Sequence, residues 1–519
     1  MRRMCLGAAV LAALLSVPAP AAAQDVRLTA RDGGLVLDGV VRASDGDFYR
    51  IDTCFGLQPL DPAGVDCTGP ACPDLEAFVA QVTISGATAM GEVLVPALVE
   101  AFAAQRGLSA SRAIRDPLGF TYSLAEQGGR LLARIDFRLT TTEEGFADLV
   151  AGEADLAMAA REVTPAEVAL GREAGIGTLS APAQSRVVAF DAFVAAVAPG
   201  NAVGAISLED LTRALSGELA DWGPLGGAAD APIRLHAMEP NLGPQQGIEA
   251  VLLTPGGLTL SPEARRHPDA AAVADAVAAD PYALGVTLAS ALGSARALPL
   301  AGDCGIALRP DDAAVRSEDY PLVAPMFLYA PARRLPAVAR DFLSFLSTPA
   351  AERVIRRAGF TDLGARRQPL SAQGERLANA VLTAGAETPL GDPQAMIRAP
   401  AGGERLSPTF RFRPGAAGLD APSRGHAVLL SEAIEAGVYD GRELIFVGFS
   451  DGEGAAEANL RIARARAETA MNAVRALSEG ADFDRIRFAA VAFGEALPMA
   501  CDDTDWGRRI NRRVEVWVR

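Results

Sequence analysis

The sequence predicts an α/β protein built from several domains. Its 519 residues are 50% hydrophobic and 22% charged, which is enough apolar material for two to four cores. Apolar runs of strand length alternate with amphipathic stretches of helix length from about Ala80 to Ala365, and the alternation returns after Leu406. Shorter alternating runs precede both regions. We therefore expect a small β module followed by two α/β regions.

The first residues are typical of a cleavable secretory signal. Two arginines precede an apolar run, Leu6–Val17, and small residues end at Ala23. We expect residues 1–23 to be removed and the mature chain to reach the periplasm. Cys5 precedes the apolar run, so we expect no lipid anchor, and no later run has the length of a membrane span.

Residues 24–78 are expected to form the small antiparallel β module, because Asp-Gly turns separate its short apolar runs. Cys67 and Cys72 stand close together among glycine and proline, so we expect a local disulfide between them. The partners of the other mature cysteines stay open. No histidine lies near these cysteines, and the sequence therefore predicts no metal site.

The charge of the chain excludes one class of partner. The formal net charge is -16, and all 48 basic residues are arginine. No segment has the basic face that nucleic-acid binding requires. We expect no nucleic-acid partner.

A short motif near the C-terminus matches the G-x-S-x-G pattern of hydrolases. Gly448-Phe449-Ser450-Asp451-Gly452 follows an apolar strand and precedes a helix. A serine nucleophile of this type needs a histidine downstream, and none follows His426. We therefore expect no catalytic residue, no enzyme activity and no cofactor.

The same turn places an aspartate beside an arginine of the next helix. Arg466 lies at the margin of an approximate apolar stripe and can reach back toward the strand end. The members of this stripe are Ile462, Ala467, Ala470, Val474 and Leu477. Asp451 and Arg466 could bind a ligand that carries both an amine and a carboxylate. An ordinary ion pair between them remains the alternative.

Further motifs extend this pattern through residues 401–519. They are Asp451, Asn459, Arg466-Ala467, the run Gly494 to Pro498, and the closing run Gly507 to Glu515 (GRRINRRVE). The segment resembles the OmpA-like peptidoglycan-binding domain, an α/β fold. The resemblance implies that Asp451 and Arg466 hold the diaminopimelate of the peptidoglycan stem peptide, with Asn459 and Arg513 as further candidates. Ser450 replaces the threonine of the family and keeps its hydroxyl.

Residues 79–365 begin with a strand, a small-residue turn and a long amphipathic helix, Val82 to Gly107. Gly86 lets a backbone approach a ligand and Thr88 offers a hydroxyl. The unpaired N–H groups at the start of a helix suit an anion.

The order of the following runs is more specific, above all LSGELADWG, Leu215 to Gly223. This region resembles the phosphate-type (PstS-like) substrate-binding proteins of ABC transporters. The resemblance implies a two-lobed periplasmic-binding-protein fold of type II that closes on its ligand, with an ABC permease as partner. It also implies an anion site. The site residues carried over are Ser85, Gly86, Thr88, Thr141, Thr142 and Arg161.

Two of the expected phosphate loops depart from the family. Glu143 and Glu144 follow the threonines of the second loop, and carboxylates oppose an anion unless they point away. In the third loop Leu242-Gly243-Pro244 replaces a hydroxyl-rich tripeptide, and proline donates no N–H. Phosphate as the ligand therefore stays open.

Residues 366–400 hold one amphipathic patch and a Pro/Gly-rich stretch, and we expect a linker. The resemblances together imply a periplasmic solute-binding protein held to peptidoglycan, near the outer membrane. The alternative is an envelope scaffold or sensor whose binding domain recognises another ligand or a protein.

Overall fold

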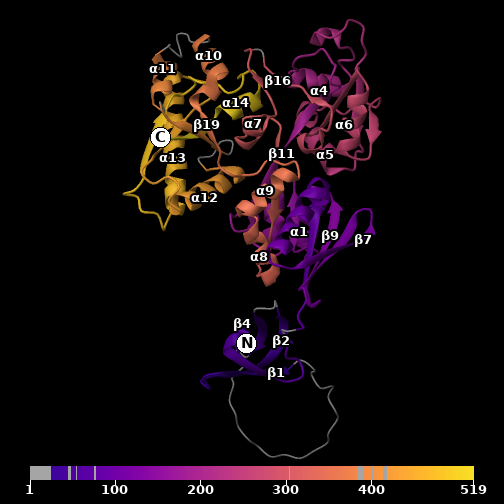
Figure 1. Cartoon of the computed structure of the whole chain (residues 1–519), viewed down its shortest axis with the longest axis vertical. Helices are drawn as coiled ribbons and strands as arrows, with labels where there is room; N and C mark the ends of the chain where they lie inside the picture. The colour runs from indigo at the N-terminus through magenta and orange to yellow at the C-terminus, as the bar shows by residue number, and fades with distance from the viewer. Residues whose placement is uncertain are drawn as a thin grey trace, which may run out of the picture. The chain divides into compact units, whose positions relative to one another are not determined.

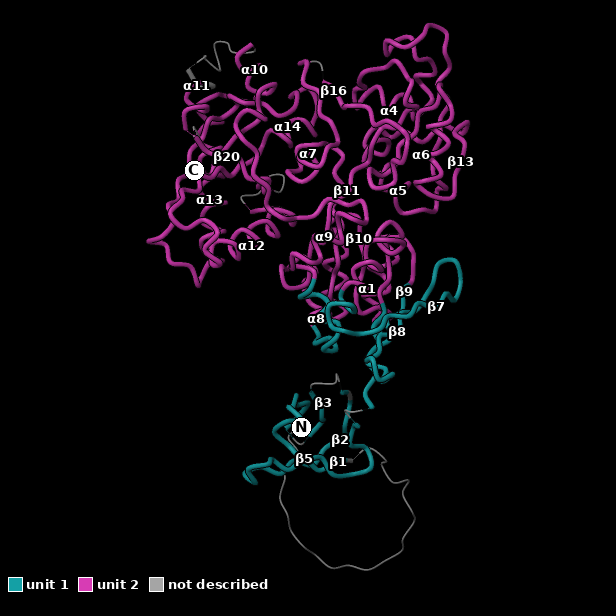
Figure 2. Tube along the Cα trace, viewed as in Figure 1, with its two compact units in different colours: residues 1–83, 102–137, 333–345 teal, residues 84–101, 138–332, 346–519 magenta. Residues whose placement is uncertain are grey.

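A computed structural model describes residues 25–44, 48–53, 55–74, 77–302, 304–382, 391–399, 402–412 and 418–519. The expected signal segment, 1–23, and Cys54 lie outside the described residues. The chain divides into two compact units (Figure 2). Unit 1 comprises Met1–Thr83, Phe102–Phe137 and Arg333–Phe345, and unit 2 comprises Ile84–Ala101, Arg138–Ala332 and Leu346–Arg519.

Unit 1 begins with a five-stranded sheet in the order β4-β3-β2-β1-β5, and every adjacent pair is antiparallel, as expected. Its strands are β1 (Asp25–Ala30), β2 (Val36–Ser44), β3 (Tyr49–Thr53), β4 (Gly56–Leu60) and β5 (Val65–Thr68). Alternate residues of β1 and β3 form its small core, namely Val26, Leu28, Tyr49 and Ile51. The disulfide predicted between Cys67 and Cys72 is confirmed and fastens the end of β5.

The rest of unit 1 packs through aromatic side chains. It contains β7 (Ser109–Asp116), β8 (Gly119–Ala125), most of β9 (Leu131–Thr140), the end of α1 (Val95–Gln105) and α8 (Ala337–Phe345). Phe102 of α1 meets the rings of Phe342 and Phe345 of α8, with centroids 5.7 and 5.9 Å away. Phe120 and Phe137 stack at 4.6 Å. These contacts join α8 to a segment more than 200 positions earlier in the chain.

A mixed sheet in the order β13-β12-β14-β11-β18-β10-β6 runs through the first part of unit 2. Its strands are β6 (Ala80–Ala87), β10 (Leu156–Ala159), β11 (Ser185–Val197), β12 (Arg234–Met238), β13 (Arg265–His267), β14 (Ala283–Leu288) and β18 (Val323–Tyr329). Short strands accompany it, β15 (Arg296–Ala297), β16 (Leu300–Ala301) and β17 (Ala307–Leu308). Parallel pairs at both ends, β12 with β13 and β14, and β10 with β6, agree with the predicted α/β class.

Strand β11 connects two groups of strands. Its first part, from Ser185 to Ala192, pairs with β18, and its last part, from Phe193 to Val197, pairs with β14. Both pairings are antiparallel. A single buried strand thus serves two lobes, which is the crossing connection expected of a two-lobed binding fold.

Helices accompany each group of strands. They are α2 (Thr142–Ala151), α3 (Pro165–Glu173), α4 (Leu208–Ser216), α5 (Gly243–Leu252), α6 (Ala270–Ala279), α7 (Asp312–Arg316) and α9 (Pro349–Arg357), with the π-helix η2 (Met90–Leu94) before α1. Figure 1 shows α4, α5 and α6 together in one lobe of unit 2. Helix α2 packs instead on β10 of the other group.

The C-terminal part of unit 2 is a second sheet in the order β19-β20-β23-β21-β22. Its elements are β19 (Arg367–Pro369), β20 (Glu404–Arg411), α12 (Ala421–Glu435), β21 (Glu443–Gly448), α13 (Ala456–Leu477), β22 (Arg487–Ala492), α14 (Asp505–Asn511) and β23 (Arg513–Val518). The alternation of strands and helices expected after Leu406 is confirmed. Phe410, Phe446, Val474, Val514 and Val516 are among the core residues between this sheet and the helices.

Helix α13 lies very close to strand β21. A Cβ added to Gly448 would stand 2.0 Å from the carbonyl oxygen of Ala463. Only small residues fit such an approach, and the buried face of α13 is therefore mostly alanine: Ala463, Ala467 and Ala470. The expected stripe was wrong at both ends, because Ile462 and Leu477 are 45% and 46% exposed.

The segment expected as a linker, 366–400, contains regular structure in its described residues. Helices α10 (Gly374–Leu382) and α11 (Gly391–Arg398) contribute Ala380 and Met396 to a core with Val447, Phe449 and Trp517. These helices therefore cover the face of the C-terminal sheet opposite to α12 and α13.

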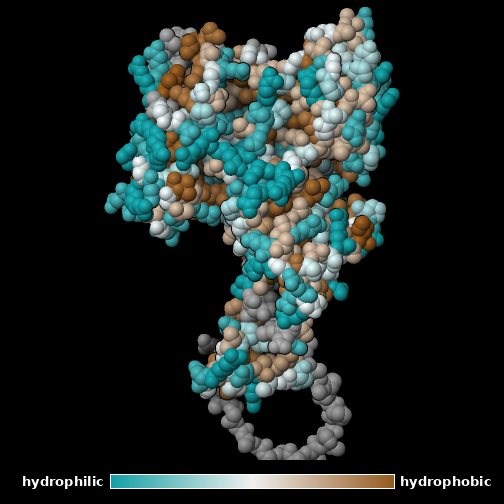
Figure 3. Space-filling model, viewed as in Figure 1, coloured by the Kyte–Doolittle hydropathy of each residue, from teal (hydrophilic) through white to brown (hydrophobic). Residues whose placement is uncertain are grey.

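A second disulfide, Cys304 to Cys501, joins residues 197 positions apart in unit 2. It connects the segment after β16 to the segment before α14. On the face drawn in Figure 3, hydrophilic residues cover much of unit 2 and apolar residues lie in small groups between them. No helix in the described part of the chain is long and apolar enough to cross a membrane.

Candidate functional site

A cavity of about 300 Å³ lies in unit 2 beside strands β11 and β18. Thr142, Glu143 and Arg161 line it from the side of α2 and β10. Gly243 and Gln246 line it from α5 in the other lobe, and Pro321–Pro325 form part of its base. Two of the six residues expected to bind an anion, Thr142 and Arg161, thus line the cavity.

The hydroxyl groups of the first expected loop are engaged inside the protein. Ser85 is fully buried, and its Oγ donates to Asp148 Oδ2 at 2.6 Å. Thr88 Oγ1 donates to the carbonyl of Thr140 at 2.9 Å. Gly86 has a φ of 125°, and a Cβ there would lie 2.2 Å from the carbonyl oxygen of Met158. Pairing with β10 therefore accounts for this glycine.

The second loop forms the start of α2. Thr141 and Glu144 make a capping box, in which the Thr141 hydroxyl accepts from the Glu144 N–H and the Glu144 carboxylate accepts from the Thr141 N–H. Thr142 Oγ1 accepts from the N–H of Ala160 at 3.1 Å. Both threonines of this turn therefore already bind backbone groups.

Arg161 is held by two carboxylates. Its Nη2 donates to Glu143 Oε1 and to Glu167 Oε1, each at 2.8 Å, and its Nη1 donates to Glu167 Oε2 at 3.0 Å. Burial works against the charge of Arg161, yet these partners raise its pKa above the ordinary value. Burial would raise the pKa of Glu167, but hydrogen bonds from Arg161 and Thr164 keep it low. Glu143 and Glu167 therefore already compensate the charge of Arg161.

The other lobe offers few donors to the cavity. Leu242 at the N-cap of α5 has no side-chain hydrogen bond, and Pro244 in the first turn lacks an N–H. Arg509 of α14 also lines the cavity. Sequence analysis missed Arg509 as a cleft residue because no local pattern relates α14 to the two lobes.

A second candidate site lies where β21 ends, at Asp451. Asp451 Oδ2 accepts from Arg512 Nη1 at 2.5 Å, and its side chain is 10% exposed. Arg466 is half-buried, with its guanidinium 5.6 Å from the ring of Phe412. Burial and the neighbouring Arg512 lower the pKa of Arg466, and Asp451 partly offsets them. The structure therefore pairs Asp451 with Arg512. Among the described residues no ion pair joins Asp451 to Arg466, although the charge of Asp451 still acts on the pKa of Arg466.

Two buried polar atoms, one in the turn after β21 and one in α13, have no hydrogen-bond partner among the described residues. They are Ser450 Oγ and Asn459 Nδ2. Ser450 is 4% and Asn459 is 4% exposed. The backbone N–H of Ser450 donates to the carbonyl of Gly494 at 2.8 Å, which fixes this turn against the next loop. Unpaired buried polar groups are costly, so they suggest a place where a ligand supplies the missing partners.

Arg513, the fourth residue expected at this site, is fully buried. Its Nε donates to Glu515 Oε1 at 2.9 Å, and its Nη2 donates to the carbonyl of Leu497 at 2.9 Å. Its backbone carbonyl accepts from the N–H of Phe449, one residue before Ser450. Arg513 thus contacts the site through the backbone.

The described residues contain no group of three histidine, cysteine or acidic side chains placed to hold a metal ion.

A family model described as a PBP superfamily domain matches residues 76–349. Among solved structures, an ABC-type phosphate transport receptor from Vibrio cholerae is 18% identical with a TM-score of 0.41, over 54% of this chain and 98% of that chain. PstS from Borrelia burgdorferi is 16% identical with a TM-score of 0.39, over 55% and 98%. No curated protein matches the chain.

Proposed function

Because the chain belongs to the PBP superfamily, we propose that it is a periplasmic solute-binding protein whose cleft takes a small anion, with phosphate as the first candidate. The observation that carries this proposal is the cavity between the two lobes, with Arg161 and Thr142 in its wall. Ligand pockets of binding proteins lie between lobes that close on the ligand. Two disulfides support an oxidising compartment.

One observation favours a second candidate, an envelope scaffold or sensor whose cleft takes another ligand. Arg161 is paired with Glu143 and Glu167, and the hydroxyls of Ser85 and Thr88 donate inside the protein. A dianion would have to displace Glu143, which is 59% exposed at its side chain. The two candidates differ in whether free phosphate binds.

Replacing Glu143 tests the cleft directly. Glu143→Gln is expected to tighten phosphate binding by roughly fivefold, because an exposed ion pair is worth up to about 1 kcal/mol and its loss frees Arg161. Arg161→Gln is expected to weaken binding at least roughly tenfold, since a charged hydrogen bond contributes about 1.5–3 kcal/mol. Calorimetric titration of phosphate into the full chain measures both.

Glu153→Gln is the matched control, because Glu153 is exposed and pairs with Arg138 away from the cavity. Absence of binding in the wild type and in Glu143→Gln would remove phosphate and favour the second candidate.

We further propose that residues 401–519 form an OmpA-like module that anchors the protein to peptidoglycan. In this proposal Asp451 takes the amine and Arg466 takes the carboxylate of the stem-peptide diaminopimelate. The unpaired atoms of Ser450, which precedes Asp451, and of Asn459 in α13 support it, because a bound ligand could supply their missing hydrogen-bond partners. Arg513, being fully buried, would position the turn rather than contact the ligand. Anchoring would keep the binding module concentrated near an ABC permease or the outer membrane.

Co-sedimentation with purified peptidoglycan tests the anchor. Asp451→Asn and Arg466→Gln are each expected to lower the affinity for peptidoglycan at least roughly tenfold, since each removes a charged contact. The bound fraction should fall accordingly. Arg464→Gln is the control, because Arg464 lies on the same helix and is 62% exposed at its side chain. If both site variants sediment like the control, the anchor proposal fails while the cleft proposal stands.

A further inference from the structure

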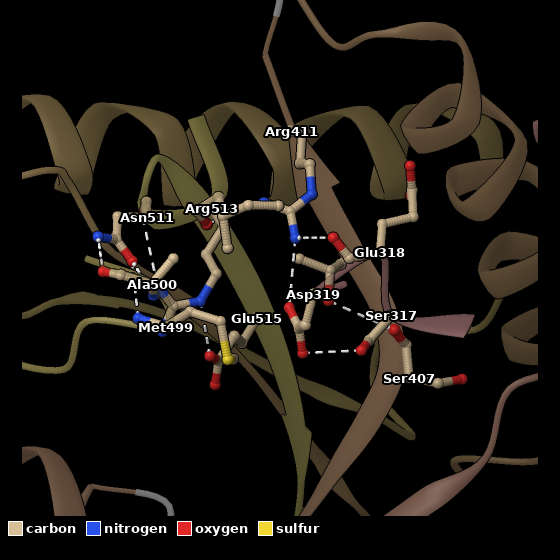
Figure 4. Close-up of polar contacts among 12 residues, drawn as sticks. Ser317, Glu318, Asp319, Ser407, Arg411, Met499, Ala500, Asn511, Arg513 and Glu515 are labelled. Carbon is tan, nitrogen blue, oxygen red and sulfur yellow. Dashed lines mark hydrogen bonds and ion pairs between the residues drawn. The ribbon is translucent and has the colours of Figure 1, made fainter. Parts of the chain in front are cut away.

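Six buried side chains of unit 2 form a cluster of charges, and of these only Arg513 also belongs to a proposed site, where it positions the turn. We call it the arginine cluster: Asp319, Arg376, Arg405, Arg411, Arg513 and Glu515. Asp319 accepts from Arg405 Nη1 at 2.7 Å and from Arg411 Nη2 at 3.2 Å. Glu515 accepts from Arg376 Nη1 and from Arg513 Nε, each at 2.9 Å. Figure 4 shows Arg411 reaching Asp319, and Arg513 beside Glu515.

The cluster holds more positive than negative charge. Four guanidinium groups share two carboxylates that stay ionised, because neighbouring arginines outweigh burial and lower the pKa of both Asp319 and Glu515. Glu318 lies next to them, but burial and Asp420 raise its pKa to about 8. At neutral pH Glu318 therefore supplies little counter-charge. Among the described residues, the cluster keeps a surplus of buried guanidinium charge.

A cavity of about 270 Å³ adjoins this surplus. Arg376, Arg405, Asp319, Ser317 and Gln373 line its inner part. The Arg376 side chain is 8% exposed, and its Nε has no hydrogen-bond partner. An unpaired donor on a buried cation that lines a cavity indicates a missing acceptor.

We propose that this cavity binds a small carboxylate, which accepts from Arg376 and offsets the surplus charge of the arginine cluster. A planar carboxylate matches the fork of a guanidinium group. Arg309, Asp311 and Glu375 also line the cavity, and the two carboxylates oppose a phosphate dianion more than a singly charged carboxylate. The volume of the cavity lies just below the range for ligand pockets, about 300–1,000 Å³. The ligand is therefore a small acid or the C-terminus of a peptide.

The site would bridge segments that are distant in sequence. Asp319 follows α7, Gln373 and Arg376 belong to the region of α10, and Arg405 belongs to β20. A bound carboxylate is thus expected to stabilise the packing of the C-terminal sheet on the segment from Gly305 to Asp319. This inference does not depend on the ligand of the cleft or on peptidoglycan binding.

The test is calorimetric titration of the full chain with acetate and with trialanine at constant ionic strength. Acetamide and trialanine amide are the neutral controls. We expect saturable binding of the carboxylates at one site and none of the amides. Tighter binding of trialanine would indicate a peptide terminus, and equal binding would indicate a free acid. No carboxylate binding, or equal binding of the amides, would overturn the proposal.

Variants assign the binding to this cavity. Arg376→Gln is expected to lose at least tenfold in affinity for acetate. Gln373→Glu places a carboxylate in the cavity without a change of size, and we expect it to fold normally and to abolish acetate binding. Gln127→Glu, on an exposed turn, should bind as the wild type does. Arg466→Gln should also bind normally, which separates this cavity from the proposed anchor. Retained binding in Gln373→Glu would overturn the assignment.

Discussion

Replacing Glu515 with glutamine is expected to lower the free energy of unfolding of the C-terminal sheet by about 3–5 kcal/mol. Glu515 is fully buried, and three arginines lie against it: Arg376, Arg513 and, with its Nε 3.6 Å away, Arg405. Trp517 Nε1 also donates to it at 3.1 Å. A neutral amide leaves these guanidinium groups buried without their counter-charge. Removing one partner of a buried ion pair costs far more than the pair contributes.

Urea unfolding followed by tryptophan fluorescence measures this effect, because Trp517 lies in contact with Glu515. Glu457→Gln is the matched control, since the Glu457 side chain is 94% exposed in α13. We expect that control to change stability by less than about 0.5 kcal/mol. A loss below about 1 kcal/mol in Glu515→Gln would contradict the arrangement of charges described for the arginine cluster.

The same cluster predicts how stability depends on pH. Burial would raise the pKa of Glu515, but Arg376, Arg405 and Arg513 keep it well below the ordinary value. A carboxylate with a lowered folded-state pKa contributes its full stability above the unfolded-state pKa of about 4.3. That contribution is lost as the pH falls toward the folded-state pKa. The wild type should therefore lose stability below about pH 4 more steeply than Glu515→Gln.

The arginine cluster also shows where sequence reasoning ends. Along β20, Arg405, Ser407, Thr409 and Arg411 alternate with apolar residues, and a period of two predicts a polar face toward solvent. All four are buried instead. Asp319, in a segment 86 positions before Arg405, covers this face. No local pattern contains that partner, so the strand was predictable and its burial was not.

The C-terminal helices and strands were predictable because their periodicities are strong and local. The turn after β21 and the arginine in α13 identified Asp451 and Arg466 as neighbours, and the charge of Asp451 does act on the pKa of Arg466. The partner of Asp451, Arg512, follows from no spacing rule. Side-chain partners across the fold depend on tertiary contacts, which sequence periodicity does not specify.

In the cleft, the sequence predicted the residue types but not the hydrogen bonds of their side chains. Small and hydroxyl residues after β6 suggested an anion loop, yet Ser85 and Thr88 donate to groups inside the fold. Glu143 was recognised as a residue that opposes an anion, and the structure places it against Arg161. The residue types therefore predicted which charges line the cavity. The direction of each hydroxyl depends on the packing of α2 against β6 and β10, which the sequence does not reveal.

Removing the disulfide between Cys304 and Cys501 is the second change with a large expected effect. The bridge closes a loop of 197 positions, and the chain-entropy relation gives up to about 5 kcal/mol for a loop of that length. Cys304→Ser and Cys501→Ser should each lower the midpoint of thermal unfolding of unit 2. Cys67→Ser serves as the control, because its bridge spans 5 positions within the N-terminal sheet. Its loss should leave unit 2 unchanged.

The position of the bridge predicts which segment becomes accessible to a protease when the bridge is lost. Cys501 stands next to α14, and Cys304 precedes the segment that carries Asp319. Without the bridge, the ion pairs of Asp319 with Arg405 and Arg411, the hydrogen bond from Arg411 to the carbonyl of Glu318 and the apolar contacts of Leu308 still hold that segment on the C-terminal sheet. Limited proteolysis should therefore cut Cys501→Ser between Gly305 and Asp319 faster than the wild type, and a reducing agent should produce the same pattern in the wild type. Equal cleavage in all cases would mean that the non-covalent contacts suffice, and the bridge would then contribute little to the packing of unit 2.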